Sequence, residues 1–350
     1  MKIAICSGGT GGHIFPACAL FEAAKSKGHA VQLITDTRGA VFCENIPDSG
    51  KIVFSSLRFS PRRIWTSFVS LCNFFIIFFR CLFAWRKLPP DAVVGFGGIF
   101  TIAPIIAAKI LGAKAVVYEQ NSVIGRANKF LSLIANLKLA NFDLPKGGWH
   151  KIAAPVRSEF LVDAPYKCDG KIRILVISGS QGAKSFCKII PEALARLDRD
   201  ICAHIEIVQQ ESYGNIEKLQ QIYDHLGVKA RIKKFITNVA KIMGESQLVI
   251  CRAGASTLSE LMAMGRPAIL IPFPEAMDNH QFQNAMYLQN KQAAWVIEEG
   301  SEVVEKLSHI LHEVSHNRNL LKTAAANMLN ESAKDAADVF VSLIEKIGEK

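Results

Sequence analysis

The sequence predicts an α/β protein of two Rossmann-like domains, each a doubly wound parallel sheet, which face each other across a cleft. Short apolar runs alternate with helical patterns along the chain, which is typical of parallel βαβ units. This rhythm restarts near residue 171, and glycine-rich turns follow strands in both halves. The chain has 350 residues, 50% of them hydrophobic, so it is long enough for two domains with sizeable cores.

The apolar runs place the strands. We expect strands at residues 2–6, 30–35, 92–96 and 114–119 in the first half, and at 171–178, 203–208, 231–236, 248–251, 268–273 and 293–297 in the second. A loop-rich stretch at residues 142–171 separates the two groups, so a domain boundary is expected in or beside it.

The first predicted strand ends in the stretch SGGTGGH, residues 7–13. Its four glycines allow a sharp turn and let backbone N–H groups approach a ligand closely. The helix that follows is expected to begin near Pro16 and to end at Gly28. A tight strand-to-helix turn is the alternative interpretation, but such a turn needs only one or two glycines.

Two more glycine-rich turns follow predicted strands, GFGGIF at 95–100 and ISGSQGAKS at 177–185. Ligands of doubly wound sheets bind outside the carboxyl ends of the strands. One such loop is a weak signal. Three of them, divided between two domains, indicate ligand sites in both.

The net charge of +10 is unevenly distributed. Residues 51–90 contain seven Lys and Arg side chains and no Asp or Glu, and they include the apolar stretch 64–85. An anionic membrane surface suits this combination better than nucleic acid does. Polar residues recur along one stripe of the predicted helix, so we expect it to lie at a membrane interface. A buried core helix and a transmembrane span are the alternatives.

The nine cysteines are scattered, without a C-x-x-C pair. We expect reduced thiols in the core of a cytosolic protein, because neither a disulfide framework nor a zinc site has this spacing. No cleavable signal peptide is expected before the first strand. His309, His312 and His316 would share one helix face, but no carboxylate or cysteine completes an obvious site, so no bound metal is expected.

Seven motifs occur in order along essentially the whole chain. They are GGTGGHIFPA (8–17), GFGGIF (95–100), YEQNSVIGRANKFLS (118–132), APVR (154–157), SGSQGA (178–183), CRAGASTLSELMAMGRP (251–267) and MDNHQFQNA (277–285). This set resembles the MurG family of peptidoglycan N-acetylglucosaminyltransferases, which have the two-Rossmann-domain (GT-B) fold. An ordered set is far more specific than any single glycine-rich loop.

The resemblance implies an inverting hexosyltransferase. It would move N-acetylglucosamine from UDP-N-acetylglucosamine to the muramoyl 4-hydroxyl of lipid I, giving lipid II for peptidoglycan and cell-wall synthesis, with no cofactor required. It implies an acceptor- and membrane-binding domain at 1–157, against which a helix at about 334–350 packs back, and a donor domain at 158–333. The enzyme would lie peripherally on the cytoplasmic face of the bacterial inner membrane. Its partners would be undecaprenyl-linked lipid I and other cell-wall synthesis or division proteins.

An inverting transfer needs a base that takes the acceptor proton and a positive potential that stabilises the departing UDP. His13 is the candidate base, because a helix N-terminus disfavours imidazolium; a hydrogen bond to the acceptor diphosphate alone is the alternative. Glu260 is expected to accept both ribose hydroxyls, since two acceptors meet two donors. A capping box formed with Thr257 is the structural alternative.

The remaining site residues follow from the resemblance. Ile236 would read uracil through its backbone, Gln281 would bind sugar hydroxyls and Arg157 would lie near the leaving diphosphate. The expected donor contacts are Thr10, Gly11, Gly12, Asn121, Arg157, Ser180, Gln181, Gly182, Ile236, Ala255, Thr257, Glu260, His280, Gln281 and Asn284. The expected acceptor contacts are Gly9, Thr10, Gly12, His13, Gly97, Gly98 and Asn121, with Glu119 in support. The expected membrane contacts are Arg62, Arg63, Trp65, Phe68, Phe75, Phe79 and Arg80.

Three positions depart from the family pattern. Ile99 replaces a common aromatic, Ala154 replaces the Asn of an N-P-V-R motif, and Ser178 begins the third glycine loop. A related GT-B transferase with another lipid acceptor is the nearest alternative. A non-catalytic nucleotide-sugar-binding protein and an NAD-dependent oxidoreductase are more distant ones, the latter with Asp36 binding a ribose. The second phosphate loop and the basic apolar segment disfavour the oxidoreductase.

Overall fold

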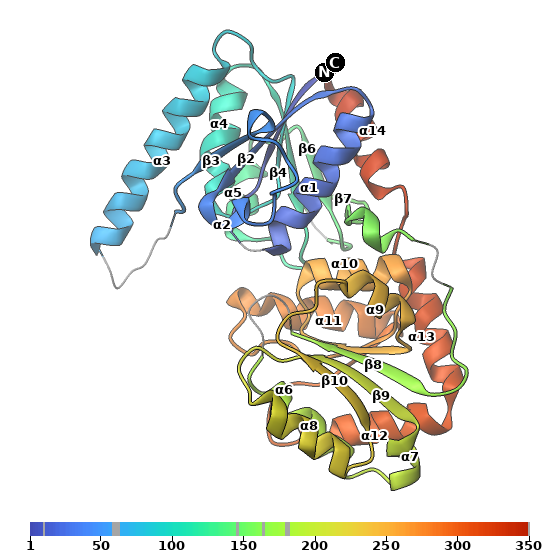
Figure 1. Cartoon of the computed structure of the whole chain (residues 1–350). Helices are drawn as coiled ribbons and strands as arrows, with labels where there is room; N and C mark the ends of the chain where they lie inside the picture. The colour runs from blue at the N-terminus through green and yellow to red at the C-terminus, as the bar shows by residue number, and fades with distance from the viewer. Residues whose placement is uncertain (10, 58–63, 145–146, 163–164, 179–182, 349–350) are drawn as a thin grey trace. The chain divides into compact units, whose positions relative to one another are not determined.

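The computed structural model describes the chain except residues 10, 58–63, 145–146, 163–164, 179–182 and 349–350, and gives the backbone alone for 64–67. The chain divides into two compact units (Figure 1). Unit 1 comprises residues 1–157 and 333–350, and unit 2 comprises residues 158–332. The divisions expected from the sequence differ by one residue, at 333. Thr10, Arg62, Arg63, Ser180, Gln181 and Gly182 lie outside the described residues.

Unit 1 is built on a parallel sheet of seven strands in the order β3-β2-β1-β4-β5-β6-β7. The strands are β1 (Lys2–Cys6), β2 (Ala30–Asp36), β3 (Lys51–Phe54), β4 (Ala92–Gly95), β5 (Lys114–Glu119), β6 (Leu137–Ala140) and β7 (His150–Lys151). In the register, Cys6 lies opposite Ile34 of β2 and Gly95 of β4. The chain therefore reverses direction of winding between β1 and β4, where the two glycine-rich turns of this unit begin.

Helices cover both faces of this sheet. They are α1 (Gly11–Ser26), α2 (Thr37–Ala40), α3 (Ile64–Trp85), α4 (Ile102–Ile110), α5 (Arg126–Leu131) and α14 (Ala336–Gly348), with short 3₁₀ turns η1 (Asp48–Gly50) and η2 (Ile99–Thr101). Alternate residues of β1 point to opposite faces. Ile3 and Ile5 join the core beneath α1 and α14, whereas Ala4 and Cys6 join the core beneath α3 and α4. The C-terminal helix α14 packs beside α1, as Figure 1 shows, and buries Phe340 in this core.

Unit 2 repeats the arrangement with six parallel strands in the order β10-β9-β8-β11-β12-β13. Its strands are β8 (Ile172–Ile177), β9 (Ile205–Gln210), β10 (Lys229–Lys233), β11 (Leu248–Cys251), β12 (Ala268–Leu270) and β13 (Ala294–Val296). Its helices are α6 (Phe186–Leu194), α7 (Arg199–Ala203), α8 (Ile216–His225), α9 (Val239–Glu245), α10 (Ala255–Met264), α11 (His280–Asn290), α12 (Val303–His316) and α13 (Arg318–Asn330), with 3₁₀ turns η3 (Ser158–Phe160) and η4 (Met277–Asn279). The predicted class of two doubly wound parallel sheets is confirmed.

The structure corrects several boundaries. All ten expected strands are present, but β10 covers 229–233 instead of 231–236, and β3, β6 and β7 were not expected. Helix α1 begins at Gly11, so Pro16 lies inside the helix instead of at its start. Pro16 lacks the N–H that would bond to the Gly12 carbonyl, but the other turns of α1 remain helical. Gly11 and Gly12 therefore belong to the first turn of α1.

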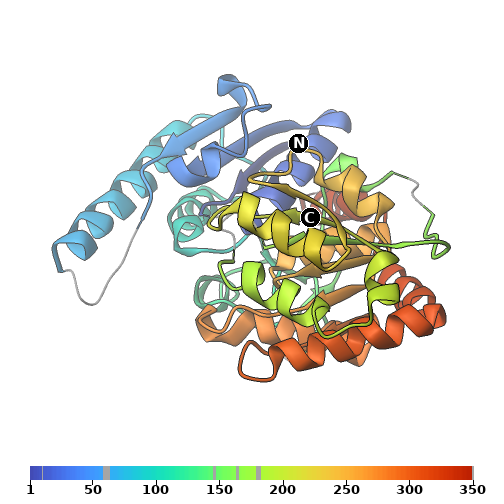
Figure 2. The ribbon, with the colours of Figure 1, turned by 60° about the horizontal axis from the view of Figure 1, so that its bottom comes forward.

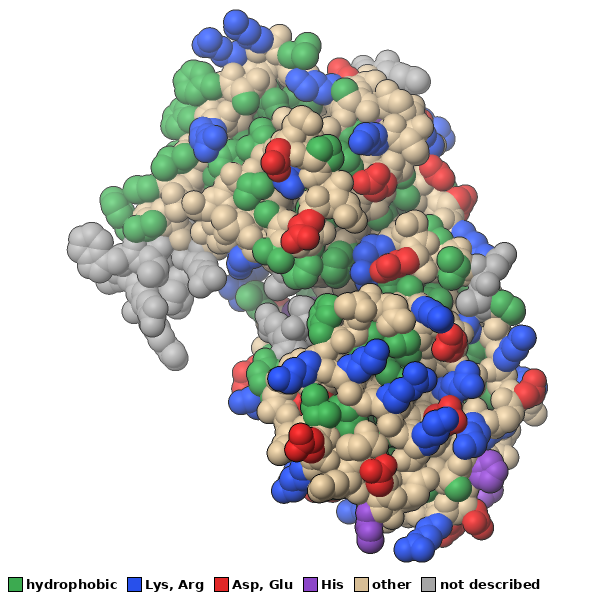
Figure 3. All heavy atoms as spheres, in the orientation of Figure 1, with side chains coloured by type: hydrophobic (Ala, Val, Ile, Leu, Met, Phe, Trp, Pro, Cys, Tyr) green, Lys and Arg blue, Asp and Glu red, His purple; other side chains and the backbone are tan. Residues whose placement is uncertain are grey.

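Helix α3 lies along the outside of unit 1 beside α4, and Figure 2 shows it extending outward. The expected polar stripe is wrong in part, because Ser70 faces the core together with Ile77, Cys81 and Trp85. Trp85 also donates its Nε1–H to Gln32 Oε1 at 2.9 Å. The residues turned outward are mostly apolar: Phe68, Val69, Leu71, Phe75, Ile76, Phe79 and Phe83. Figure 3 shows this hydrophobic face along α3, with Lys and Arg side chains gathered at its upper end.

Among the described residues, Phe68–Trp85 is the one helical segment whose length and apolar composition match a membrane span. The position of α3 between two strands of one sheet argues against a membrane-spanning helix. Helix α3 connects β3 to β4 within one sheet, and its inner face contributes Ile77, Cys81 and Trp85 to the core of unit 1. Helix α3 is therefore anchored in the core of unit 1 on one side and presents an exposed apolar face on the other.

Candidate functional site

Five of the expected acceptor-side residues, Gly9, Gly12, His13, Gly97 and Gly98, follow β1 or β4, whereas Asn121 follows β5. His13 is the third residue of α1, where backbone N–H groups lack intrahelical partners and the helix dipole is positive. Gly97 and Gly98 follow β4 with φ angles of 87° and 81°, and Gly9 follows β1 with φ of 89°. These left-handed conformations explain three of the glycines, because other residues adopt them only with strain.

His13 lies against the Gly97 backbone. A Cβ atom added to Gly97 would be 3.3 Å from His13 Cδ2 and 3.2 Å from Asn128 Nδ2. The imidazole and the Asn128 amide are therefore close neighbours over this glycine. The structure brings together His13 and Gly97 as the sequence motifs imply, and it adds Asn128 to them.

We expect Gly97→Ala to reduce turnover through this contact. The new methyl group would lie 3.3 Å from His13 Cδ2, so the ring would have to shift by a few tenths of an ångström. A misplacement of about 1 Å can cost roughly 100-fold in rate, so this smaller shift should cost roughly 2- to 10-fold. Gly112→Ala is the matched control, since Gly112 has φ of 93° and nothing within 4 Å of the added Cβ. Both variants should lose about 1–2 kcal/mol of stability from backbone strain. Steady-state kinetics in which both variants lost the same activity would contradict the contact argument.

Asp36 supports the first glycine loop. Its Oδ1 accepts hydrogen bonds from the N–H groups of Gly9 at 3.2 Å and Gly39 at 2.9 Å, and the Arg38 side chain donates to Oδ2 at 2.7 Å. Burial by itself would raise the pKa of Asp36, but the bonds from Arg38, Gly39 and Gly9 outweigh it and lower that pKa. The oxidoreductase alternative predicts that this carboxylate binds a ribose. In the structure it instead accepts hydrogen bonds from the glycine loop.

Glu119 organises the loop that carries Asn121. Its Oε1 accepts from the Asn121 backbone N–H at 3.0 Å, and its Oε2 accepts from the Gly125 N–H at 2.9 Å and from Asn128 Nδ2 at 2.8 Å. Burial raises the pKa of Glu119 despite these three bonds and a fourth, from Asn121 Nδ2 to Oε1 at 3.2 Å. The supporting role expected of Glu119 matches this geometry. Asn128, missed as a site residue, lay within the same sequence motif, seven positions after Asn121.

Arg157 is the last residue of the first segment of unit 1. Its guanidinium lies 4.3 Å from the centroid of the Phe15 ring, which projects from α1 two residues after His13. A cation over an aromatic face is held in place by the ring quadrupole. The side chain expected near the leaving diphosphate is therefore attached to the helix that carries His13.

The donor-side helix α10 begins differently from the capping-box alternative. Gly254 is the N-cap, so Ala255 and Thr257 are the first and third helical residues. Thr257 is inside the helix and cannot be its cap, which makes the capping-box interpretation wrong. The first N–H groups of α10 point out of the helix end, where anions bind favourably.

Glu260 is the sixth residue of α10, and 7% of its surface is exposed. Burial, together with the nearby Glu260 carboxylate, raises the pKa of the Cys251 thiol to about 12. The carboxylate is therefore held beside the end of β11, at the carboxyl edge of the sheet where ligands of this fold bind.

The segment before α11 has an unusual backbone. Asp278 and Asn279 both have positive φ, at 51° and 53°, although neither is glycine. Such conformations cost energy and cluster at functional sites. They lead directly into His280, whose Nδ1 is 2.6 Å from the Met277 carbonyl, and Gln281, whose Oε1 accepts from the Phe273 N–H at 3.0 Å.

Two expected donor residues have internal partners. The Ile236 N–H donates to Gln210 Oε1 at 3.2 Å, and Asn284, fully buried, donates from Nδ2 to the Ala253 carbonyl at 3.3 Å. Asn284 thus fixes the residue that precedes Gly254 and α10. A uracil bound by the Ile236 N–H would have to displace the Gln210 side-chain oxygen from it.

Arg252 was missed as a site residue, although it lies in the motif that contains Glu260. Its guanidinium donates to the carbonyls of Ile271 and Pro272, each at 3.1 Å, and it pairs with Glu299. It also donates to Ser185 Oγ at 3.1 Å, next to the third glycine loop. One cation thereby joins the loops that follow β8, β11 and β12.

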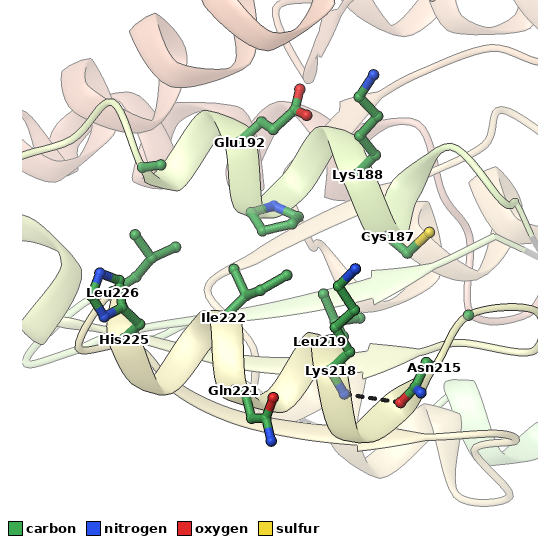
Figure 4. A pocket seen from close by; sticks show the side chains of 13 residues that line it. Cys187, Lys188, Glu192, Asn215, Lys218, Leu219, Gln221, Ile222, His225 and Leu226 are labelled. Carbon is green, nitrogen blue, oxygen red and sulfur yellow. Dashed lines mark hydrogen bonds between the residues drawn. The ribbon is translucent and has the colours of Figure 1, made fainter.

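A groove of 720 Å³ lies elsewhere on unit 2, between α6 and α8 (Figure 4). Pro191, Leu219 and Ile222 line it together with polar groups that include Lys188 and His225. None of the described donor-side residues lines this groove, so it is a separate surface. Within the described part of the chain, no cluster of His, Cys, Asp and Glu has the arrangement of a metal site. Of the three histidines on α12, His316 has its Nδ1 atom 2.9 Å from the backbone carbonyl of His312.

Comparison with known proteins identifies the family. Residues 3–138 match the glycosyltransferase family 28 N-terminal domain and residues 173–340 match the family 28 C-terminal domain. A relative from Rhizobium meliloti, 37% identical over 99% of this chain and 95% of its own length, is a UDP-N-acetylglucosamine–N-acetylmuramyl-(pentapeptide) pyrophosphoryl-undecaprenol N-acetylglucosamine transferase. A relative of the same name from Caulobacter vibrioides is 33% identical over 98% of both chains. The chain belongs to the MurG family.

A crystal structure of Acinetobacter baumannii MurG superposes with a TM-score of 0.82 at 25% identity, covering 99% of each chain. The MurG fold and the family expected from the seven motifs are thus confirmed. This chain is a glycosyltransferase of the GT-B class, and the oxidoreductase alternative is excluded.

Proposed function

We propose that this protein transfers N-acetylglucosamine from UDP-N-acetylglucosamine to the muramoyl 4-hydroxyl of lipid I, with inversion at the sugar, and so forms lipid II. The observation that carries the proposal is its full-length similarity to relatives named for this reaction. The geometry of each unit supports the same reaction.

Unit 1 would bind the acceptor. Gly9 and the positive end of α1, with Gly11 and Gly12 in its first turn, suit the diphosphate of lipid I, because unpaired N–H groups at a helix start and the helix dipole stabilise anions. His13 would take the proton from the 4-hydroxyl as the new glycosidic bond forms. Asp36 and Glu119 would act as positioning residues, since each carboxylate holds one of the loops around this site.

Unit 2 would bind the donor. Glu260 would accept the two ribose hydroxyls, and the N–H groups at the start of α10, with Ala255 and Thr257, would face the diphosphate. Positive potential there stabilises UDP as the bond to the sugar breaks. Gln281 and His280 would complete the sugar side, while Asn284, which is fully buried, would position Ala253 ahead of α10. No step requires a resident metal, because helix dipoles and amides meet the diphosphate charge.

The proposed location is the cytoplasmic face of the inner membrane, where α3 would contact the lipid. Phe68, Phe75 and Phe79 are 59%, 50% and 48% exposed, which is unusual for large apolar side chains in a row along a helix. Arg80 is exposed at the edge of this face, its guanidinium 5.1 Å from the Phe54 ring centroid. Cations beside an apolar helix face favour anionic headgroups.

We expect the double variant Phe75→Ser with Phe79→Ser to bind anionic lipid vesicles at least roughly tenfold more weakly, because each buried Phe contributes about 2 kcal/mol. Sedimentation with vesicles containing an acidic phospholipid measures this. Leu133→Ser is the control, since Leu133 is 80% exposed elsewhere in unit 1. Equal binding by the double variant and the wild type would refute contact through α3.

The proposed reaction is tested by incubating the protein with radiolabelled UDP-N-acetylglucosamine and a short-chain analogue of lipid I. The label is expected in a product that carries the disaccharide in β linkage. A second acceptor, a lipid-linked sugar without the muramoyl group, distinguishes the related-transferase alternative. Labelling of that acceptor and not of the lipid I analogue would overturn the proposal.

A further inference from the structure

Two thiols of unit 1 that the proposed reaction does not use contact one another. The Sγ atoms of Cys18 and Cys43 are 3.2 Å apart, although the residues are separated by 25 positions in the sequence. Cys18 lies on α1, and Cys43 follows α2. The spacing of the cysteines along the chain gave no indication of this pair.

The two thiols differ in their surroundings. Cys18 is half-buried, whereas Cys43 is 2% exposed and its Sγ is 3.4 Å from the Gly39 carbonyl. The hydrogen bond between the two sulfurs lowers the pKa of Cys43 against the effect of burial, and the Lys51 ammonium adds to this. The same contact raises the pKa of Cys18. Cys43 is thus the thiol of the pair that ionises first, and thiolates are the nucleophilic form.

We propose that Cys18 and Cys43 form a reversible intramolecular disulfide when the protein meets a peroxide. The Cys43 thiolate attacks one peroxide oxygen, the O–O bond breaks and hydroxide leaves, which oxidises Cys43 to a sulfenic acid. The Cys18 thiol then attacks that sulfur, the S–S bond forms, and water leaves with the thiol proton. One peroxide is reduced for each pair of thiols oxidised, and an external thiol reverses the reaction.

The local packing favours the bond. Shortening the distance from 3.2 Å to the length of a disulfide, about 2.05 Å, requires a movement of roughly 1 Å. The segments that carry the two thiols already pack together, since the rings of Phe15 and Phe42 meet edge to face with centroids 5.3 Å apart. The bond would join α1 to the segment that follows α2. His13 lies in the first turn of α1, and the N–H of Gly39 in α2 donates to Asp36.

The experiment treats the whole protein with hydrogen peroxide and maps its thiols by proteolysis and mass spectrometry. The expected product is a linked pair of peptides containing Cys18 and Cys43, lighter by two hydrogens and separated again by dithiothreitol. It should form before Cys6 and Cys81 react, because burial raises the pKa of both of those thiols, whereas the pKa of Cys43 is lowered. The readout does not depend on sugar transfer, so it stands or fails separately from the proposed function.

Three variants assign the roles. Cys18→Ser is expected to stop at a Cys43 sulfenic acid, which a 1,3-diketone such as dimedone traps, and Cys43→Ser is expected to leave Cys18 reduced. Cys72→Ser, which removes an exposed thiol on α3, should form the disulfide as the wild type does. Wild-type protein in which peroxide oxidises Cys72 but never links Cys18 to Cys43 would overturn the proposal. A dimedone adduct on Cys18 and not on Cys43 would overturn the assigned order of attack.

Discussion

His13→Ala is expected to lower kcat for sugar transfer by about 100- to 10,000-fold, the usual contribution of a general base. The affinity for UDP-N-acetylglucosamine should change little, because Glu260, Gln281 and the start of α10, which would bind the ribose, the sugar and the diphosphate, all belong to unit 2. His13 lies in the first turn of α1 against Gly97, where a neutral imidazole beside an anion cradle can accept the proton of a bound hydroxyl. Transfer kinetics and isothermal titration with the donor measure the two effects separately.

His150→Ala is the control for this prediction, since His150 is an exposed histidine of the same unit, on the short strand β7. It should retain wild-type kinetics. The alternative role, binding the acceptor diphosphate without taking the proton, predicts a different pattern for His13→Ala. In that case KM for the acceptor rises while kcat at saturating acceptor stays within a few-fold of the wild type.

The fold could be predicted from the sequence wherever strands are buried on both faces. Strands β4 and β11 are continuous apolar runs, and β1 and β8 are apolar apart from Lys2 and Arg173 near their starts, because helices cover both sides of the sheet. Strands β3, β6 and β7 escaped prediction for the opposite reason: they lie toward one edge or the other of their sheet and are short or polar, β7 consisting of His150 and Lys151 alone. The start of α1 was misplaced because Pro16 suggested a first turn that the glycines already form.

The candidate site was predictable only to the level of motifs. His13, Gly97 and Glu260 could be named because family motifs mark them. The binding partner of Asp36 could not be predicted from the sequence. Asp36 ends a strand, as a ribose-binding acid does, yet it accepts hydrogen bonds from backbone N–H groups of the neighbouring loops. Arg252 escaped for a related reason, because its partners Ser185, Ile271 and Glu299 are distant in sequence. Long-range contacts of this kind leave no periodic signal.

Glu260→Ala is expected to weaken binding of UDP-N-acetylglucosamine by about 10- to 100-fold, because hydrogen bonds to a charged group contribute about 1.5–3 kcal/mol. Glu260 is buried on α10 at the carboxyl edge of the sheet, and its carboxylate matches the ribose diol, two acceptors to two donors. Glu305→Ala is the control, an exposed carboxylate of the same unit on α12. It should bind the donor as the wild type does.

A double cycle tests the assigned contact directly. The wild type should bind the 2′-deoxyribose analogue of the donor roughly tenfold more weakly than the natural donor, because one hydrogen bond to the carboxylate is lost. Glu260→Ala has already lost that acceptor, so it should bind both nucleotides almost equally. If the variant distinguished them as strongly as the wild type does, Glu260 would not contact the ribose. Its burial beside Cys251 would then serve only the packing of β11 and α10.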